Sequence, residues 1–142
     1  MNTQTLQPVM RPMLRPLHGM ALGGAFALTL CALLADIAYA RSYEIQWSNF
    51  AAWLVLGAAV FLGIALLFAG IAWLGDRQRF GPRPLHFLAL LIGFLVAVLN
   101  SFVHAMDAWQ KMPTALILSI IAWVCVVAAA AIPGYFERRA RA

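Results

Sequence analysis

Long apolar runs divide this chain into four segments, separated by three short polar connectors. Each run matches the roughly 20 helical residues that cross the hydrocarbon core of a bilayer. The pattern predicts membrane-spanning helices at about residues 19–40, 50–74, 85–106 and 113–133. We therefore expect an all-α, integral membrane four-helix bundle over residues 15–136, because no connector is long enough to fold alone. Residues 1–14 are expected to form a flexible cytoplasmic tail, and residues 137–142 a short basic one.

Composition supports a lipid environment. Apolar residues make up 64% of the chain and charged residues 11%, against about 25% charged residues in soluble domains. A small soluble protein cannot hide so much apolar surface. The net charge of +5 does not indicate nucleic-acid binding, because the basic residues lie only outside the apolar runs. Cys31 and Cys125 lie inside apolar runs without C-x-x-C spacing, so they indicate packing rather than a disulfide or a zinc site.

The distribution of basic residues predicts the orientation. One side would carry Arg11, Arg15, Arg77, Arg79, Arg83, Arg138, Arg139 and Arg141, and the other only Arg41 and Lys111. By the positive-inside rule, both termini should be cytoplasmic in a bacterial inner membrane. Tryptophans at predicted span ends fit an interfacial belt: Trp47, Trp53, Trp73 and Trp109. The "AYA" at 38–40 imitates a signal-peptide cleavage site, but Asp36 interrupts the run, and we expect the first helix to be retained.

A short repeat relates the two halves of the chain. The letters "RPLH" occur at 15–18 and at 83–86, and aligning residue n with n + 68 places Asp36 opposite His104. The second helices of each half align poorly. The repeat predicts two helical hairpins related by an axis along the membrane normal, with the first and third helices diagonal. Pro16 and Pro84 suit the first turn of their helices.

The two RPLH histidines, His18 and His86, are candidates for a shared site. Paired histidines on opposite helices can bind a haem b from both sides. They can also contact a quinone or a lipid headgroup. The alternative is that each is a polar residue in a first helical turn that reaches the headgroup layer. Their position close to the helix start favours this alternative over a buried haem.

A second candidate site lies near the other membrane face. His104 and Asp107 share a helix face at i, i+3 spacing, and the repeat brings Asp36 to the same depth. Asn100 and Ser101 lie one turn deeper. A structural hydrogen bond between Asp36 and His104 is the favoured interpretation. A proton or quinone site is an alternative, and Asp36, His104 and Asp107 are weak candidates for a metal site.

The fourth apolar run contains almost no polar residue, so it is expected to face lipid or a partner subunit. Pro133 and Gly134 should end this helix. The sequence has no phosphate-binding glycine loop, nucleophile elbow, H-E-x-x-H or C-x-x-C-H. These observations favour a protein that is not an enzyme.

Several stretches together resemble the bacterial membrane proteins grouped as domain of unknown function 2231. They are "RPLH", "LLADIAYA", "WSNFAAWLVLGAAVFLGIALLFAGIAWL" and, most specifically, "LNSFVHAMDAW". The resemblance covers residues 12–135 and implies a four-helix inner-membrane domain. It points to the polar positions His18, Asp36, His86, His104 and Asp107. A redox role has been suggested for such proteins, which would fit haem or quinone binding.

Three classes of function remain open from the sequence. The favoured class is a non-catalytic membrane subunit or anchor, which can form homo-oligomers or assemble with partner membrane subunits. The second is an electron-transfer protein that binds haem b or quinone. The third is a small transporter or proton-conducting protein built on the repeat, with Asp36 and His104 as its acid–base pair.

Overall fold

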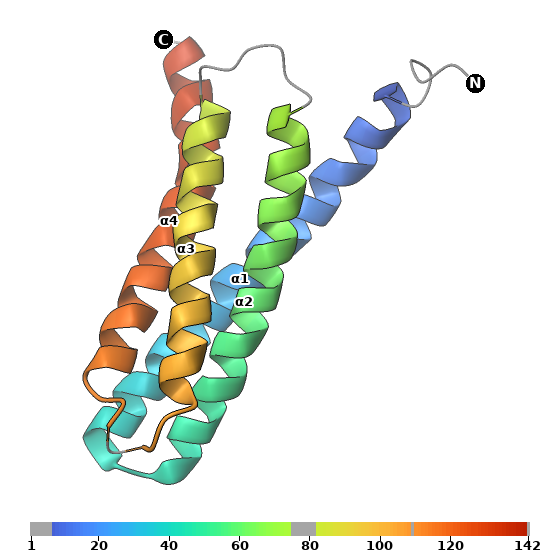
Figure 1. Cartoon of the computed structure of the whole chain (residues 1–142). Coiled ribbons are helices and arrows are strands. Elements are labelled where there is room, and N and C mark those ends of the chain that lie inside the picture. The colour runs from blue at the N-terminus through green and yellow to red at the C-terminus, as the bar shows by residue number, and fades with distance from the viewer. Residues whose placement is uncertain (1–6, 75–81, 109, 142) are drawn as a thin grey trace.

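Four α-helices follow one another in this computed structural model, which describes residues 7–74, 82–108 and 110–141 (Figure 1). Their bounds are Gln7–Ser42 for α1, Ile45–Leu74 for α2, Pro82–His104 for α3 and Thr114–Arg141 for α4. The described residues contain no β-strand. Each helix includes a segment long and apolar enough to cross a membrane. The predicted all-α four-helix membrane bundle is confirmed.

Two predicted helix ends are wrong, and both lie beside a proline. Helix α1 begins at Gln7, so the expected flexible tail is helical from that residue and Pro16 lies inside the helix. Helix α4 continues through Pro133 and Gly134 to Arg141, which also includes the expected basic tail. A proline removes one helical hydrogen bond, but other groups in a membrane bundle can bind the freed carbonyl.

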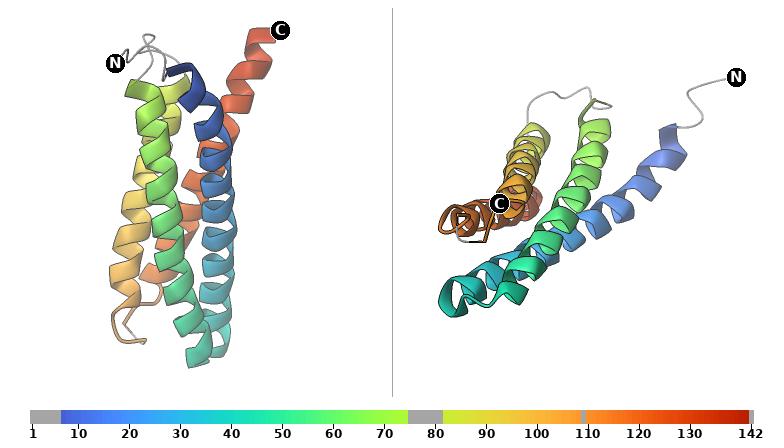
Figure 2. Two further views of the ribbon diagram at one scale, coloured as in Figure 1. Left: turned by 90° about the vertical axis from the view of Figure 1, so that its right-hand side faces the viewer. Right: turned by 60° about the horizontal axis from the view of Figure 1, so that its bottom comes forward.

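The four helices form a ring in chain order. Helix α1 packs beside α2, α2 beside α3, α3 beside α4, and α4 beside α1. Helices α1 and α3 are therefore diagonal, as the repeat predicts. The start of α1 and the end of α4 lie at the same end of the bundle (Figure 1, Figure 2). Of the residues used to predict orientation, Arg77, Arg79 and Trp109 lie outside the described residues.

Small side chains let the helices approach closely. Alanines form most of the buried apolar interior, and Leu62, Leu90 and Val126 are its largest fully buried apolar side chains. A Cβ added at Gly24 would collide with the Phe61 ring, so the two helices approach this closely with glycine unless that ring moves. Larger apolar side chains lie on the outside of all four helices. This distribution is expected for helices that pack through small residues and present long apolar residues to lipid.

The burial pattern repeats between the two hairpins. In α1 and α3 the buried positions match at 68 residues: Ala25 with Gly93, Thr29 with Ala97, Ala32 with Asn100, and Asp36 with His104. In α2 and α4 they match at 64 residues: Ala51 with Ala115, Val55 with Ser119, Ala58 with Ala122, Leu62 with Val126, and Ala65 with Ala129. The spacings of the two helix pairs differ by about one helical turn. This difference explains why the second helices align poorly when the 68-residue spacing is imposed.

Candidate functional site

Two polar pairs join α1 to α3 across the bundle interior. The Nε2 atoms of His18 and His86 lie 3.0 Å apart. The Nε2 atom of His104 lies 3.0 Å from Oδ1 of Asp36. Both pairs join residue n to residue n + 68, and residues related by a twofold axis can touch each other only at that axis. The pairs therefore mark the predicted pseudo-twofold axis, about 27 Å apart along α1 at 1.5 Å per residue.

The second ring nitrogen of each RPLH histidine binds the backbone of a neighbouring helix. His18 Nδ1 donates to the Ala65 carbonyl of α2 at 3.1 Å. His86 Nδ1 donates to the Ala129 carbonyl of α4 at 2.8 Å. Ala129 lies four residues before Pro133, which has no N–H to donate to that carbonyl. The histidine therefore satisfies the carbonyl that the proline leaves free, and α4 remains helical at this point.

The contacts of the histidine pair determine its protons. A carbonyl oxygen only accepts, so Nδ1 of both His18 and His86 must carry a hydrogen. In two neutral rings, both Nε2 atoms would then present lone pairs to each other at 3.0 Å. A hydrogen bond between them requires a third proton on the pair. A pair that is hydrogen-bonded in this way would carry one positive charge.

A haem between these histidines does not fit the residues present. The donor chemistry is suitable, because a ligating histidine usually donates its other N–H to a carbonyl. However, Ala65 and Ala129, whose carbonyls bind the two rings, are completely buried. Helices α2 and α4 thus close both sides of the pair, where a porphyrin would need a flat slot. The electron-transfer interpretation gains no support at this position.

The second pair is part of a larger hydrogen-bonded cluster. Asp36 is fully buried, and its Oδ2 accepts a hydrogen bond from Ser119 Oγ of α4 at 2.5 Å. His104 Nδ1 donates to the Asn100 carbonyl, one turn earlier in α3, at 2.9 Å. Both carboxylate oxygens of Asp36 and both ring nitrogens of His104 therefore have partners. The cluster ties α1 to α3 and to α4.

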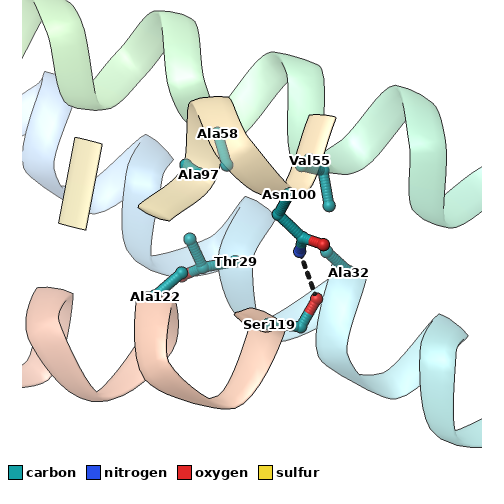
Figure 3. A pocket seen from close by; sticks show the side chains of 8 residues that line it. All are labelled: Thr29, Ala32, Val55, Ala58, Ala97, Asn100, Ser119 and Ala122. Carbon is teal, nitrogen blue, oxygen red and sulfur yellow. Dashed lines mark hydrogen bonds between the residues drawn. The ribbon is translucent and has the colours of Figure 1, made fainter. Parts of the chain in front are cut away.

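Asn100 extends this cluster toward the bundle centre. Its Nδ2 donates to Ser119 Oγ at 2.8 Å (Figure 3). Both residues line a cavity of about 10 Å³, which has room for about one water molecule. The other lining residues are Thr29, Ala32, Val55, Ala58, Ala97 and Ala122. The buried Asn100 Oδ1 has no hydrogen-bond partner among the described residues.

The Asp36–His104 pair can hold its proton on either residue without changing its net charge. With the proton on His104, the pair is a carboxylate beside an imidazolium. With the proton on Asp36, both groups are neutral. Both forms have zero net charge, and a buried pair that is neutral overall avoids much of the cost of an isolated buried charge. The pair is thus suited to a structural role and also to local proton exchange.

A lysine lies over the same end of the bundle. The buried Lys111, from the segment between α3 and α4, donates through Nζ to Ser48 Oγ of α2. Its Nζ also lies 5.6 Å from the centre of the Tyr39 ring of α1. Tyr39 donates its hydroxyl to the Ala108 carbonyl at 3.0 Å. Burial lowers the pKa of Lys111, and the nearby charge of Asp36 opposes this shift.

The structure brings together most of the polar residues singled out from the sequence. Asp107 is exposed, and the described residues include no group of three His, Cys, Asp or Glu side chains placed to hold a metal ion. Ser101 binds the Ala97 carbonyl of its own helix.

Sequence reasoning missed Ser119, Lys111 and Ser48 as members of this end of the bundle. Ser119 had a usable signal, since it is the only hydroxyl side chain in the apolar run of α4 after Thr114, the first residue of that helix. The expectation that α4 faces lipid or a partner subunit did not include this interior contact of Ser119.

Comparison with known proteins gives one match. A family model described as "Predicted membrane protein (DUF2231)" covers residues 14–135. No curated protein and no solved structure matches.

Replacement of Ser119 by alanine tests the polar cluster. The Ser119→Ala variant removes the donor to Asp36 and the acceptor of Asn100, so we expect it to lower the free energy of unfolding by about 1–2 kcal/mol. Ser101→Ala is the matched control, because that hydroxyl binds only its own helix, and we expect a change below about 0.5 kcal/mol. Unfolding in mixed detergent micelles measures both. Equal effects would contradict an interhelical role for Ser119.

The pH dependence of stability tests the burial of Lys111. The pKa of Lys111 in the folded protein lies below the ordinary value of 10.5. At pH values between this folded-state pKa and 10.5, the unfolded chain therefore binds more protons than the folded protein. The stability contributed by Lys111 should therefore rise as pH increases through the folded-state pKa toward 10.5. Thermal unfolding from neutral pH to pH 10.5 should show this rise relative to Lys111→Met, which cannot titrate. Parallel profiles of the two proteins would show that Lys111 is not buried.

Proposed function

The chain belongs to this family of predicted membrane proteins, since the family model covers most of its length, and on that premise we propose that it is a non-catalytic membrane subunit. In this proposal the buried polar residues hold two helical hairpins in a fixed arrangement. The observation that carries it is that the ionisable pairs His18–His86 and Asp36–His104 both bind across the hairpin boundary. Apart from His104 Nδ1, which binds the Asn100 carbonyl of its own helix, the side-chain polar atoms of these residues contact other helices.

The positions of these contacts support a structural role. The histidine pair binds near one end of the bundle and the Asp36 cluster near the other, so the diagonal helices are fixed at two depths. Side bonds from His18 to α2 and from His86 to α4 attach the remaining helices. In lipid, the hydrophobic effect does not drive helices together, and such polar contacts add to the packing of small residues. The resulting bundle can serve as an anchor for partner membrane subunits or for further copies of itself.

We further propose that this bundle lies in a bacterial inner membrane with both termini in the cytoplasm. The excess of arginine at one end supports this orientation. A reporter that fluoresces only in the cytoplasm, fused after Ala142, should therefore be fluorescent. A reporter active only outside the cytoplasm should be active when inserted beside Asp107, which is exposed. The opposite readouts would contradict the proposed orientation.

Proton transfer is a second candidate function, favoured by the Asp36–His104 pair. The pair can exchange a proton internally at constant net charge, and it lies close to one end of the bundle. The interior between this cluster and the histidine pair is occupied mainly by alanine, leucine and valine. Transfer across the membrane would therefore require a conformational change or water entry.

A double-variant cycle at this pair tests its structural role. Asp36→Leu alone or His104→Leu alone leaves a buried polar partner, and we expect each to lower the unfolding free energy by about 3 kcal/mol. The double variant should recover most of this loss, because a buried ion pair can be replaced by apolar residues of similar volume. Unfolding in mixed micelles gives the coupling energy between the two positions.

The same variants in proteoliposomes test proton transfer. The non-catalytic proposal predicts that wild type and double variant have the same proton permeability, equal to that of empty vesicles. Ser101→Ala is the control for reconstitution. Proton flux that depends on the wild-type pair would contradict the non-catalytic proposal and support the second candidate.

A further inference from the structure

We propose that His18 and His86 form a two-coordinate site for one soft monovalent metal ion, Cu(I), bound between their facing Nε2 atoms. The inference goes beyond the proposed structural function and does not depend on it. The pair joins α1 to α3 whether a proton or a metal ion lies between the rings.

The hydrogen bonds of the pair prepare both Nε2 atoms as ligands. Each Nδ1–H is fixed by a carbonyl, at 3.1 Å for His18 and 2.8 Å for His86. This leaves the lone pair of each neutral ring on Nε2, which is the form of histidine that binds metals. A carbonyl on the second nitrogen also orients the ring and makes it a better ligand. Two lone pairs that face each other are stable only with a cation between them.

The rings are placed end to end, as linear coordination requires. Their centroids lie 5.1 Å apart and their Nε2 atoms 3.0 Å apart. The centroid separation exceeds the Nε2–Nε2 distance by nearly the sum of the two centroid-to-nitrogen distances. Both nitrogens therefore lie nearly on the line between the centroids. A shared proton and a two-coordinate metal ion both occupy this line. Two-coordinate linear binding by nitrogen donors is a common geometry of Cu(I).

Charge and ligand number favour a monovalent ion. Divalent zinc or copper takes four or more ligands in most protein sites, and the described residues include no cluster of three metal-binding side chains. Both imidazoles are neutral when they bind a metal ion, so the site keeps the full charge of its cation. A single charge costs far less than a double charge in a low-dielectric interior.

The site must widen by about 1 Å to hold the metal ion, because two metal–imidazole bonds of about 2 Å separate the nitrogens by about 4 Å. Helix α1 has room for this shift. A Cβ atom added at Gly19 or at Gly23 would have no neighbouring atom within 4 Å. The N-terminal part of α1 leans away from the other helices (Figure 1). His18 is half-buried, whereas His86 is buried, so an ion can reach the pair from the side of α1.

Titration with Cu(I) under anaerobic, reducing conditions tests the proposal. The protein, purified in mild detergent with Cys31→Ala and Cys125→Ala as background, competes for Cu(I) with a coloured chelator. We expect one ion per chain. X-ray absorption should show two nitrogen ligands at about 2 Å and no sulfur. Sulfur ligands or a higher coordination number would overturn the proposal.

Variants locate the ion and separate this proposal from the structural one. His18→Ala and His86→Ala should each reduce Cu(I) affinity at least tenfold, whereas His104→Ala should leave it unchanged. Helix content and elution volume identify a variant that has not folded. In that case the number of ions bound and the ligand set of the parent protein decide the question. Unchanged Cu(I) binding in a folded His18→Ala protein would overturn the metal site. The structural proposal is tested separately, by the coupling energy between Asp36 and His104.

Discussion

A buried polar group in a membrane bundle must find its partner within the protein, since lipid supplies none. Asp36 shows how far this constraint organises the structure. Its carboxylate has no exposed surface and accepts from His104 of α3 and Ser119 of α4. These bonds fix the rotation of three helices relative to one another. Apolar packing alone tolerates small rotations of a helix, whereas a carboxylate with two directed partners does not.

The same constraint explains how prolines are accommodated. Inside α4, Pro133 leaves the Ala129 carbonyl without its helical donor, and His86 supplies one from a different helix. The hydrogen bond that is missing within α4 is thus replaced by one between α3 and α4. The corresponding carbonyl in the first hairpin, that of Ala65, accepts from His18 although Ala69 follows it at the fourth position. The histidine contacts are therefore equivalent in geometry but differ in their backbone context.

The sequence predicted the features that follow from composition and from repetition. Four apolar runs established the helices, and the two RPLH copies indicated the 68-residue spacing that pairs Asp36 with His104. It did not predict Ser119 as their partner, because the second helices are offset by about one turn and their correspondence was hidden. Lys111 was also missed as a buried residue, since a lone lysine in a connector is ordinarily solvated. Helix ends beside prolines depended on acceptors from other helices, which no local pattern reveals.

The pseudo-twofold axis gives the single chain a chemical freedom that two separate hairpins would lack. In a symmetric homodimer of one hairpin, each residue on the axis would meet an identical residue. Histidine could face histidine, as His18 faces His86, but an aspartate would meet a second aspartate and repel it. Joining two non-identical hairpins covalently allows the equivalent positions 36 and 104 to carry an acid and a base. The linked chain can therefore hold a complementary pair on its axis, where exact symmetry would impose two like groups.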